Sequence, residues 1–256
     1  MIRVTWLGHA TTVVDVGGVR FVTDPLLRRH AAPLRRRGPA PRPNQLNGVE
    51  AVLLSHLHHD HADVPSLRFL RHVPVFAASE NARWLTRATG GEAVALEPHQ
   101  WHRLDAVGGE IEVMRVRADH KSRPMPHRPN AAVGFLVRAG GRVIWFAGDT
   151  ELYGPMVQLP ALAGARIDLA LLPIGGWGPR LSPGHMGPVE AARAAELAGV
   201  RHVVPIHWGS LHPPGMHLRS GWLTRPPAEF AEALSQFAPA CTMIEAPVGQ
   251  QITIPL

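Results

Sequence analysis

The stretch "SHLHHDHAD", residues 55–63, places four histidines and two aspartates in eight consecutive positions, directly after the apolar run "AVLL". Imidazole and carboxylate groups are common ligands of divalent metals. Alternate side chains of an extended segment point the same way, so His56 and His58 can bind one metal while Asp60 and His61, past the bend, reach a second. Solvated surface histidines are the alternative, but the end of a buried strand is a typical place for a site.

Three other strand ends supply the remaining ligands that a dinuclear site needs. Two metals that share a bridging carboxylate require about seven ligands, and the first stretch supplies four. Asp149 follows the apolar run "VIWFAG" and is a short carboxylate that can approach both metals. His207 follows "VVPI", and His120 follows "EVMRVRA" and completes a three-imidazole site. Taken singly, Asp149 could cap a turn and each histidine could be an ordinary, partly buried one; together with the cluster they favour metal binding.

Length and composition predict one domain that spans residues 1–256. The chain is 45% hydrophobic, which is enough for a substantial core. Cys241 is the only cysteine, which excludes an intramolecular disulfide and a thiolate metal cluster. The chain starts at once with strand-like residues, and no stretch approaches the roughly eighteen apolar residues of a membrane span. We therefore expect a soluble, cytoplasmic protein.

The net charge of +6 is concentrated in residues 25–48, which carry six arginines and no acidic residue. This segment is rich in proline, which predicts an extended surface loop rather than a helix or strand. The loop between Arg28 and Arg42 is either a solvated surface, an attractor for an anionic substrate or membrane surface, or, least favoured, a nucleic-acid contact. Arginine accounts for nearly all the basic residues, a bias that suits phosphate recognition but that genomic base composition explains equally well.

Hydrophobic patterns predict strands covered by helices. Gly-Gly pairs at 17–18, 108–109 and 140–141 lie between strand-like runs and predict hairpins, with an antiparallel meander over residues 92–148. The runs "AVLLS", "LALLPI" and "HVVPI" are typical of strands buried on both faces. Helical patterns span residues 64–73, 79–89 (with Ser79 as N-cap), 187–199 and 226–238. The combination indicates an α/β layered sandwich.

The motifs "SHLHHDH", "FAGDT" and "PIHWGS", with the N-terminal "TWLGHATTVVDVGGVRFVTDP", resemble the metallo-β-lactamase superfamily. The similarity is greatest to the branch of the ascorbate-6-phosphate lactonases and the N-acylphosphatidylethanolamine-hydrolysing phospholipase D. It implies an αββα sandwich, two mixed sheets flanked by helices, with the site at one edge between the sheets. It also implies the ligand sets: His56, His58 and His120 at one metal, Asp60, His61 and His207 at the other, and Asp149 as the bridge.

The resemblance assigns roles to residues beyond the ligands. A histidine at the position of His185, just before a helix, faces the substrate in the phospholipase-like members, where it can stabilise developing negative charge or protonate a leaving group. A helix-capping histidine is the alternative. His9 and Asp24 also match branch motifs and are expected to orient ligands, or to form a site wall in the case of His9. Asp60 is expected to orient a metal-bridging hydroxide as the nucleophile, so the catalytic residues are Asp60 and His185.

The expected function is a hydrolase that uses two divalent metals, with zinc expected and Mn²⁺ or Fe²⁺ as alternatives. The basic loop favours a phosphodiester substrate, lipid-like or small, over the alternative of a lactone, which itself can be phosphorylated. An iron-dependent redox enzyme of the same fold is the alternative from another class. We expect an anionic small-molecule or lipid-like substrate and no nucleic acid, because 256 residues leave little space for a further binding domain. Peripheral membrane contact through the basic loop and a homo-oligomer remain open.

Overall fold

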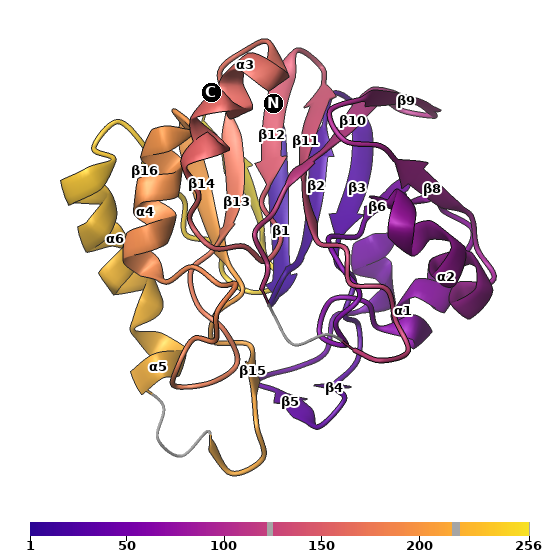
Figure 1. Ribbon diagram of the computed structural model, residues 1–256, viewed down its shortest axis with the longest axis horizontal. Helices are drawn as coiled ribbons and strands as arrows, with labels where there is room; N and C mark the ends of the chain where they lie inside the picture. Colours follow the sequence, from indigo (N-terminus) through magenta and orange to yellow (C-terminus); the bar gives the residue numbers. More distant parts are fainter. Residues whose placement is uncertain (122–124, 217–220, 256) are drawn as a thin grey trace.

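The structure, a computed structural model, describes residues 1–121, 125–216 and 221–255. Two seven-stranded sheets pack face to face (Figure 1). The first sheet has the order β17 (Gln251–Ile254), β1 (Ile2–Gly8), β2 (Thr11–Val16), β3 (Val19–Thr23), β6 (Ala51–Leu53), β7 (Val75–Ala78), β8 (Ala93–Leu96). The second has the order β16 (Thr242–Met243), β14 (His202–Ile206), β13 (Leu169–Pro173), β12 (Arg142–Phe146), β11 (Val133–Ala139), β10 (Gly109–Arg117), β9 (Trp101–Ala106).

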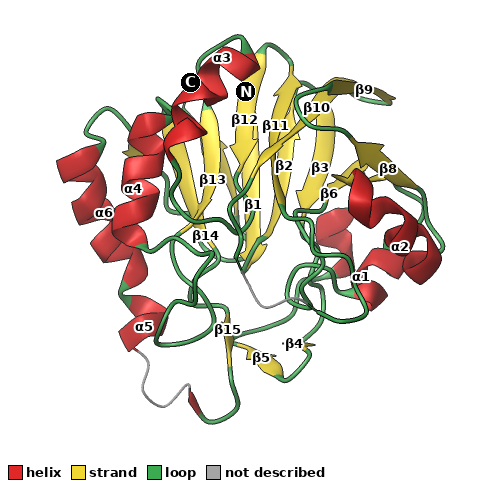
Figure 2. Ribbon diagram, in the orientation of Figure 1, coloured by secondary structure: helices red, strands yellow, loops and turns green. Residues whose placement is uncertain are grey.

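Helices cover the outer faces of both sheets (Figure 2). The helices α1 (Val64–Phe69) and α2 (Ser79–Thr89) lie on the first sheet. The second sheet is covered by α3 (Leu159–Ala163), α4 (Pro188–Leu197) and α6 (Pro226–Phe237), with the 3₁₀ turn η2 (Gly154–Gln158) before α3 and the short α5 (Gly221–Thr224) before α6. The expected αββα sandwich of two mixed sheets is confirmed. No helix in the described part of the chain has the length and hydrophobicity to cross a membrane.

Alternation along the strands explains the layers. In β2, Val14 faces the second sheet and joins the core between the sheets, whereas its neighbour Val13 packs under α1 and α2. In β13, Leu171 lies between the sheets while Leu172 packs under the helices of the second sheet. Side chains of a strand alternate between its two faces, so a strand buried on both faces is apolar throughout. The three apolar runs predicted as doubly buried strands are β6, β13 and β14, as expected.

Three Gly-Gly turns meet at one end of the sandwich. A Cβ on Gly18 would lie 2.0 Å from the carbonyl oxygen of Gly108, and one on Gly17 would lie 2.5 Å from the amide nitrogen of Gly140. Backbone from the two sheets therefore touches where any larger residue would force them apart. Each turn leads into a strand, β3, β10 or β12, whose other end runs to a predicted site residue: Asp24, His120 or Asp149.

Two secondary-structure predictions for the sheets and helices of the sandwich need correction. The meander is antiparallel only from β9 to β12; the strand β8 leaves it and pairs in parallel with β7 in the first sheet. Residues 79–89 are helical, but the N-cap position is Ala78 rather than Ser79, whose hydroxyl donates to Glu80 instead of capping the helix. Both errors arise because pairing and cap geometry depend on the neighbouring β7 strand, which runs directly into the helix.

The basic segment 25–48 is less extended and less exposed than predicted. It contains the hairpin β4 (His30–Ala31) and β5 (Leu34–Arg36), which forms a small sheet with β15 (Leu211–His212), and the 3₁₀ turn η1 (Pro43–Leu46). The Arg36 side chain is buried, with the residue 7% exposed, and donates to the carbonyl oxygens of Leu7, Leu26 and Arg28. Arg28 is paired with Asp63, the N-cap of α1. Two of the six arginines therefore hold the fold together.

Candidate metal centre

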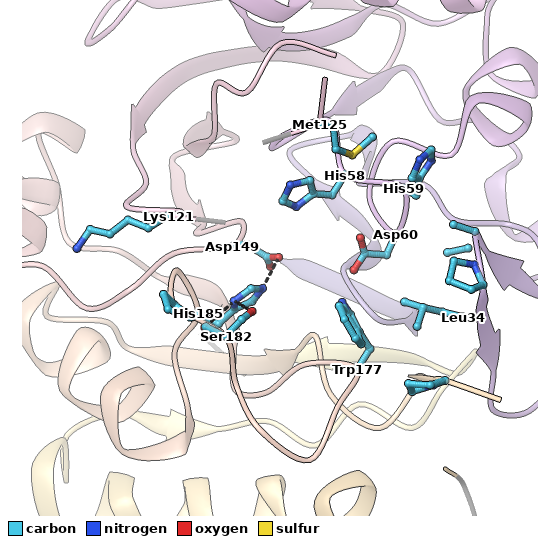
Figure 3. A pocket seen from close by; sticks show the side chains of 15 residues that line it. Leu34, His58, His59, Asp60, Lys121, Met125, Asp149, Trp177, Ser182 and His185 are labelled. Carbon is cyan, nitrogen blue, oxygen red and sulfur yellow. Dashed lines mark hydrogen bonds and ion pairs between the residues drawn. The ribbon is translucent and has the colours of Figure 1, made fainter. Parts of the chain in front are cut away.

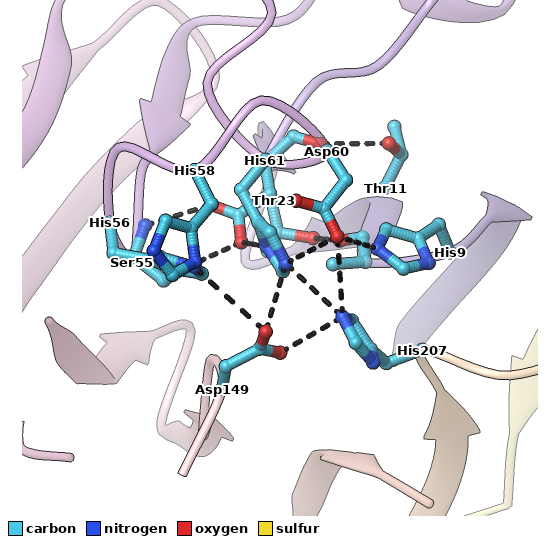
Figure 4. Close-up of polar contacts among 12 residues, drawn as sticks. His9, Thr11, Thr23, Ser55, His56, His58, Asp60, His61, Asp149 and His207 are labelled. Atoms are coloured by element: carbon cyan, nitrogen blue, oxygen red, sulfur yellow. Dashed lines mark hydrogen bonds and ion pairs between the residues drawn. The ribbon is translucent and has the colours of Figure 1, made fainter. Parts of the chain in front are cut away.

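The seven predicted ligands converge at one edge of the sandwich, although they come from both sheets. The segment with His56, His58, Asp60 and His61 follows β6 of the first sheet. The other three residues follow β10, β12 and β14 of the second sheet: His120, Asp149 and His207. Figure 4 shows most of these side chains pointing toward one another. The structure therefore brings together, beyond strand ends, the residues that the sequence patterns singled out.

The first group contains three ring nitrogens. His56 Nε2 lies 2.9 Å from His58 Nδ1, and His120 Nε2 lies 3.1 Å from the same atom. Ligand atoms about 2.0–2.1 Å from a tetrahedral metal are separated from one another by about 3.3 Å. The spacing of the three nitrogens is therefore close to what a single metal ion requires.

The second group contains two ring nitrogens and a carboxylate. His61 Nε2 and His207 Nε2 are 3.1 Å apart, and Asp60 Oδ2 lies 3.7 Å from the first and 4.0 Å from the second. His61 and His207 are fully buried, and Asp60 is 8% exposed. These separations again bracket those of a tetrahedral metal site.

Asp149 lies between the two groups. Its Oδ2 is 3.9 Å from His56 Nε2 and 3.1 Å from His61 Nε2, and its Oδ1 is 3.1 Å from His207 Nε2 (Figure 4). The buried Oδ1 makes no hydrogen bond to any residue that the structure describes, despite this proximity. A carboxylate that faces ligands of both groups, with one oxygen left without a hydrogen bond, has the position of a bridge.

Hydrogen bonds on the far side of the rings fix which nitrogen faces the site. The Nδ1–H groups donate outward: His61 to Asp24 at 2.6 Å, His207 to the Gly175 carbonyl at 2.9 Å and His120 to the Gly184 carbonyl at 2.8 Å. A neutral histidine held in this way presents the lone pair of Nε2 inward. Two facing lone pairs, as on His61 and His207, repel each other unless a cation lies between them.

The charges of the site also favour a cation at its centre. Burial would raise the pKa of Asp149, but His207 and His61 hold it well below its usual range, so Asp149 is ionised. Burial opposes the charging of His61, yet Asp149 and Asp60 raise its pKa well above the usual value. Two buried carboxylates therefore favour a positive charge among them. Without a metal, a proton on His61 supplies this charge; a divalent ion would take its place, and the donor set fits such an ion.

His9 and Asp24 support the ligands from behind. Burial lowers the pKa of His9 to about 3, so the ring is neutral at pH 7, and its Nε2 lies 3.0 Å from Asp60 Oδ2. The His9 carbonyl accepts from the backbone N–H of His207 at 2.9 Å. Asp24 accepts from Ser55 and His61. Contacts of this kind orient metal ligands in metalloproteins, and they are the contacts that the expected role of His9 and Asp24 requires.

His185 faces the site and does not cap α4, whose N-cap is Gly187. Its Nε2 lies 3.3 Å from Asp149 Oδ2, and its Nδ1–H donates to the Ser182 carbonyl at 3.0 Å. Burial opposes its protonation, but Asp149 raises the pKa of His185. A protonated ring suits proton donation. His185 is also close enough to His120 and Asp149 to share a metal with them, so its geometry fits either role.

A cavity of 670 Å³ opens over the site and is lined by His58, Asp60, Asp149 and His185 (Figure 3). Two features of this region were missed by the sequence analysis. Trp177, in the loop after β13, also lines the cavity. Arg128 donates to the Leu57 and Ala62 carbonyls at 2.8 and 3.2 Å and so holds the histidine-rich loop. The strand-end rule could have pointed to Trp177, whereas a loop arginine carries no such signal.

Comparison with known proteins agrees with this geometry. The model of the beta-lactamase superfamily domain matches residues 19–208. A metal-dependent hydrolase of Pyrococcus furiosus is 31% identical over 216 residues, which cover 83% of this chain and 87% of that protein. The N-acyl-phosphatidylethanolamine-hydrolyzing phospholipase D 1 of Caenorhabditis elegans is 28% identical over 225 residues, which cover 80% of this chain and 63% of that protein.

Solved structures share the fold at lower identity. A metallo hydrolase from Ignicoccus hospitalis superimposes with a TM-score of 0.75 and 22% identity over 100% of this chain and 99% of its own. A diiron beta-hydroxylase from Streptomyces venezuelae gives a TM-score of 0.69 and 17% identity over 100% of this chain and 54% of its own. With the match of the domain model, these findings identify the family: the chain belongs to the beta-lactamase superfamily and has the metallo-β-lactamase fold.

Proposed function

We propose that the protein is a dinuclear metal-dependent hydrolase that cleaves a phosphodiester bond in a small or lipid-like substrate. The observation that carries the proposal is the position of Asp149 between two groups of three ligand atoms each. The P. furiosus relative is named a metal-dependent hydrolase and the C. elegans relative a phospholipase D. Lys121 lines one end of the cavity, where its ammonium group is paired with Glu151.

The ligands would be His56, His58 and His120 for one metal and Asp60, His61 and His207 for the other, with Asp149 shared. Two bound divalent ions supply a water of lowered pKa as the nucleophile and act as Lewis acids toward a phosphoryl oxygen; zinc is the expected metal. Residues of the chain then control the geometry of the reaction, and no protein nucleophile is required.

Asp60 and His185 have the positions of the two acting side chains. The neutral His9 ring donates to Asp60 Oδ2 and holds the carboxylate in place to accept a hydrogen bond from the attacking water. His185 lines the cavity on the other side, where a proton on Nε2 is available to the leaving oxygen. The Ser182 carbonyl keeps the Nδ1–H of His185 turned away, which directs Nε2 to the reacting group.

Elemental analysis of the anaerobically purified protein tests the metal centre. We expect about two zinc ions per chain. Asp149→Ala should lose both ions, whereas His56→Ala should chiefly empty one site. Equal, full occupancy in both variants would show that Asp149 is not the bridge. A single iron per chain with no zinc would move the protein to the redox members of the fold.

Turnover by the metal-loaded protein should then be measured on matched panels of phosphodiesters, lactones and thioesters. We expect the highest kcat/KM for phosphodiesters. A clear preference for lactones, with phosphodiesters inert, would replace the proposed substrate class.

A further inference from the structure

The cavity over the metal centre has one apolar side. Its volume of 670 Å³ is within the usual range for pockets that bind small organic ligands. Figure 3 shows Leu34 and Lys121 at opposite ends, with Asp149 between them. The wall at the Leu34 end is built from hydrocarbon side chains: Ala31, Ala32, Pro33, Leu34 and Pro213. A polar scissile group and an apolar arm would therefore meet different parts of the cavity.

This wall is preformed. Leu34 is 8% exposed and Ala31 is 1% exposed, and both pack against Leu26 and Leu211 in a small core of their own. The strand β5 is hydrogen-bonded to β4 on one side and to β15 on the other. Because the wall is already ordered, little conformational entropy is lost when a ligand lies along it.

Trp177 extends the apolar surface across the mouth of the cavity. The residue is 42% exposed, although tryptophan is usually well buried. Figure 3 shows Trp177 and Met125 on opposite sides of Asp60. An exposed indole beside a reactive centre offers a large apolar area at a low entropic cost.

Basic side chains are nearly absent from the described residues that line the cavity. Among the residues that line it in the described part of the chain, Lys121 is the sole lysine or arginine, and it is paired with Glu151 at 2.9 Å. The basic segment, residues 25–48, contributes its apolar turn at 31–34 to the lining of the cavity but none of its six arginines. Arg28 and Arg36, on either side of this turn, are held by Asp63 and by backbone carbonyls. A compact, highly charged substrate would leave the apolar wall facing water.

We propose that the site takes an amphiphilic substrate, whose apolar arm lies between the wall at 31–34 and Trp177 while its scissile group lies over Asp60 and Asp149. Trp177 and Ala32 are then specificity-determining residues. The inference rests on the proposed function, since the metal centre positions the scissile group. It makes the apolar arm, rather than the charge of the head group, the main source of binding energy.

Equilibrium binding tests the inference without turnover. Isothermal titration of the metal-loaded protein with ethyl-, butyl-, hexyl- and octylphosphonate should show a Kd that falls with chain length, by up to about fourfold per methylene. In Trp177→Ala this factor per methylene should decrease. Phe69→Ala removes an aromatic ring that is 52% exposed on α1, outside the cavity, and it should retain the wild-type trend. A Kd that does not change with chain length in the wild type would overturn the inference.

A second variant places a charge in the wall. Ala32 has a positive φ of 48°, a conformation that aspartate adopts more readily than most residues, so Ala32→Asp should fold. It should remove the chain-length dependence, while Ala32→Gly should keep it. Unchanged dependence in both Ala32→Asp and Trp177→Ala would also overturn the inference. If the Kd trend is present but phosphodiesters are not hydrolysed, the apolar subsite stands and the proposed reaction fails.

Discussion

Replacement of Arg36 tests whether the basic segment serves the fold. The guanidinium donates to the carbonyls of Leu7 and Arg28 at 2.9 and 3.1 Å and to Leu26, in a site where the residue is only 7% exposed. Burial lowers the pKa of Arg36 to about 10, so the group is still charged at pH 7. Arg36→Met keeps the apolar stem and leaves three carbonyls without this donor.

The expected loss of unfolding free energy is about 2–4 kcal/mol. Hydrogen bonds from a charged donor contribute about 1.5–3 kcal/mol each, and release of the buried charge into water offsets part of the sum. Arg35→Met is the matched control, because the neighbouring side chain is exposed and should change stability by less than about 0.5 kcal/mol.

Urea unfolding, followed by circular dichroism with equal slopes for all three proteins, measures the difference. If Arg36→Met and Arg35→Met lose equal stability, the buried hydrogen bonds of Arg36 do not anchor the hairpin, and the reasoning fails.

Three further predictions concern the site and the surface. His185→Ala should keep its metal while kcat falls by about 100-fold or more, the usual cost of losing a general acid or oxyanion donor; loss of metal with full activity in the remaining holoenzyme would make His185 a ligand. The double variant Arg35→Gln, Arg37→Gln should raise KM for an anionic phosphodiester and weaken its salt dependence, with kcat and a neutral lactone little affected; equal effects on both substrates would exclude steering. Burial raises the pKa of Cys241 to about 12, so at pH 8 iodoacetamide should alkylate the native thiol far more slowly than the urea-unfolded thiol. The alkylation rate of the native thiol should increase about tenfold for each pH unit above 8. Equal native and unfolded rates at pH 8 would contradict this prediction.

Much of the metal centre was predictable because its geometry is local. His56, His58, Asp60 and His61 are close in sequence, and each of the other candidate ligands lies within three residues of a strand end. Strand ends on facing sheets meet at one edge, so position in the pattern was enough to bring them together. The layers were predictable for the same reason, since continuous apolar runs require cover on both faces.

The features that the sequence did not predict depend on contacts between distant segments of the chain. The acceptors of Arg36 come from two separate stretches, Leu7 and residues 26–28, so nothing next to Arg36 in sequence distinguishes it from the exposed Arg35. The apolar wall exists because β5 pairs with β15, where Leu211 lies opposite Arg36, 175 residues earlier in the sequence. The pairing of β8 with β7 was likewise decided by the topology of the sheet rather than by the composition of residues 93–96.

The three Gly-Gly turns affect the candidate metal site although they lie at the opposite end of the sandwich. Each of the strands β3, β10 and β12 begins at a Gly-Gly turn and ends near Asp24, His120 or Asp149. Gly18 and Gly108 are in backbone contact there, so the turns set the distance between the sheets at the base of the sandwich. Because each of the two ligand groups takes residues from both sheets, that distance is transmitted along stiff strands to the spacing of the ligand atoms within each group. An alanine at Gly18 would thus change the geometry of the candidate metal site from the opposite end of the molecule.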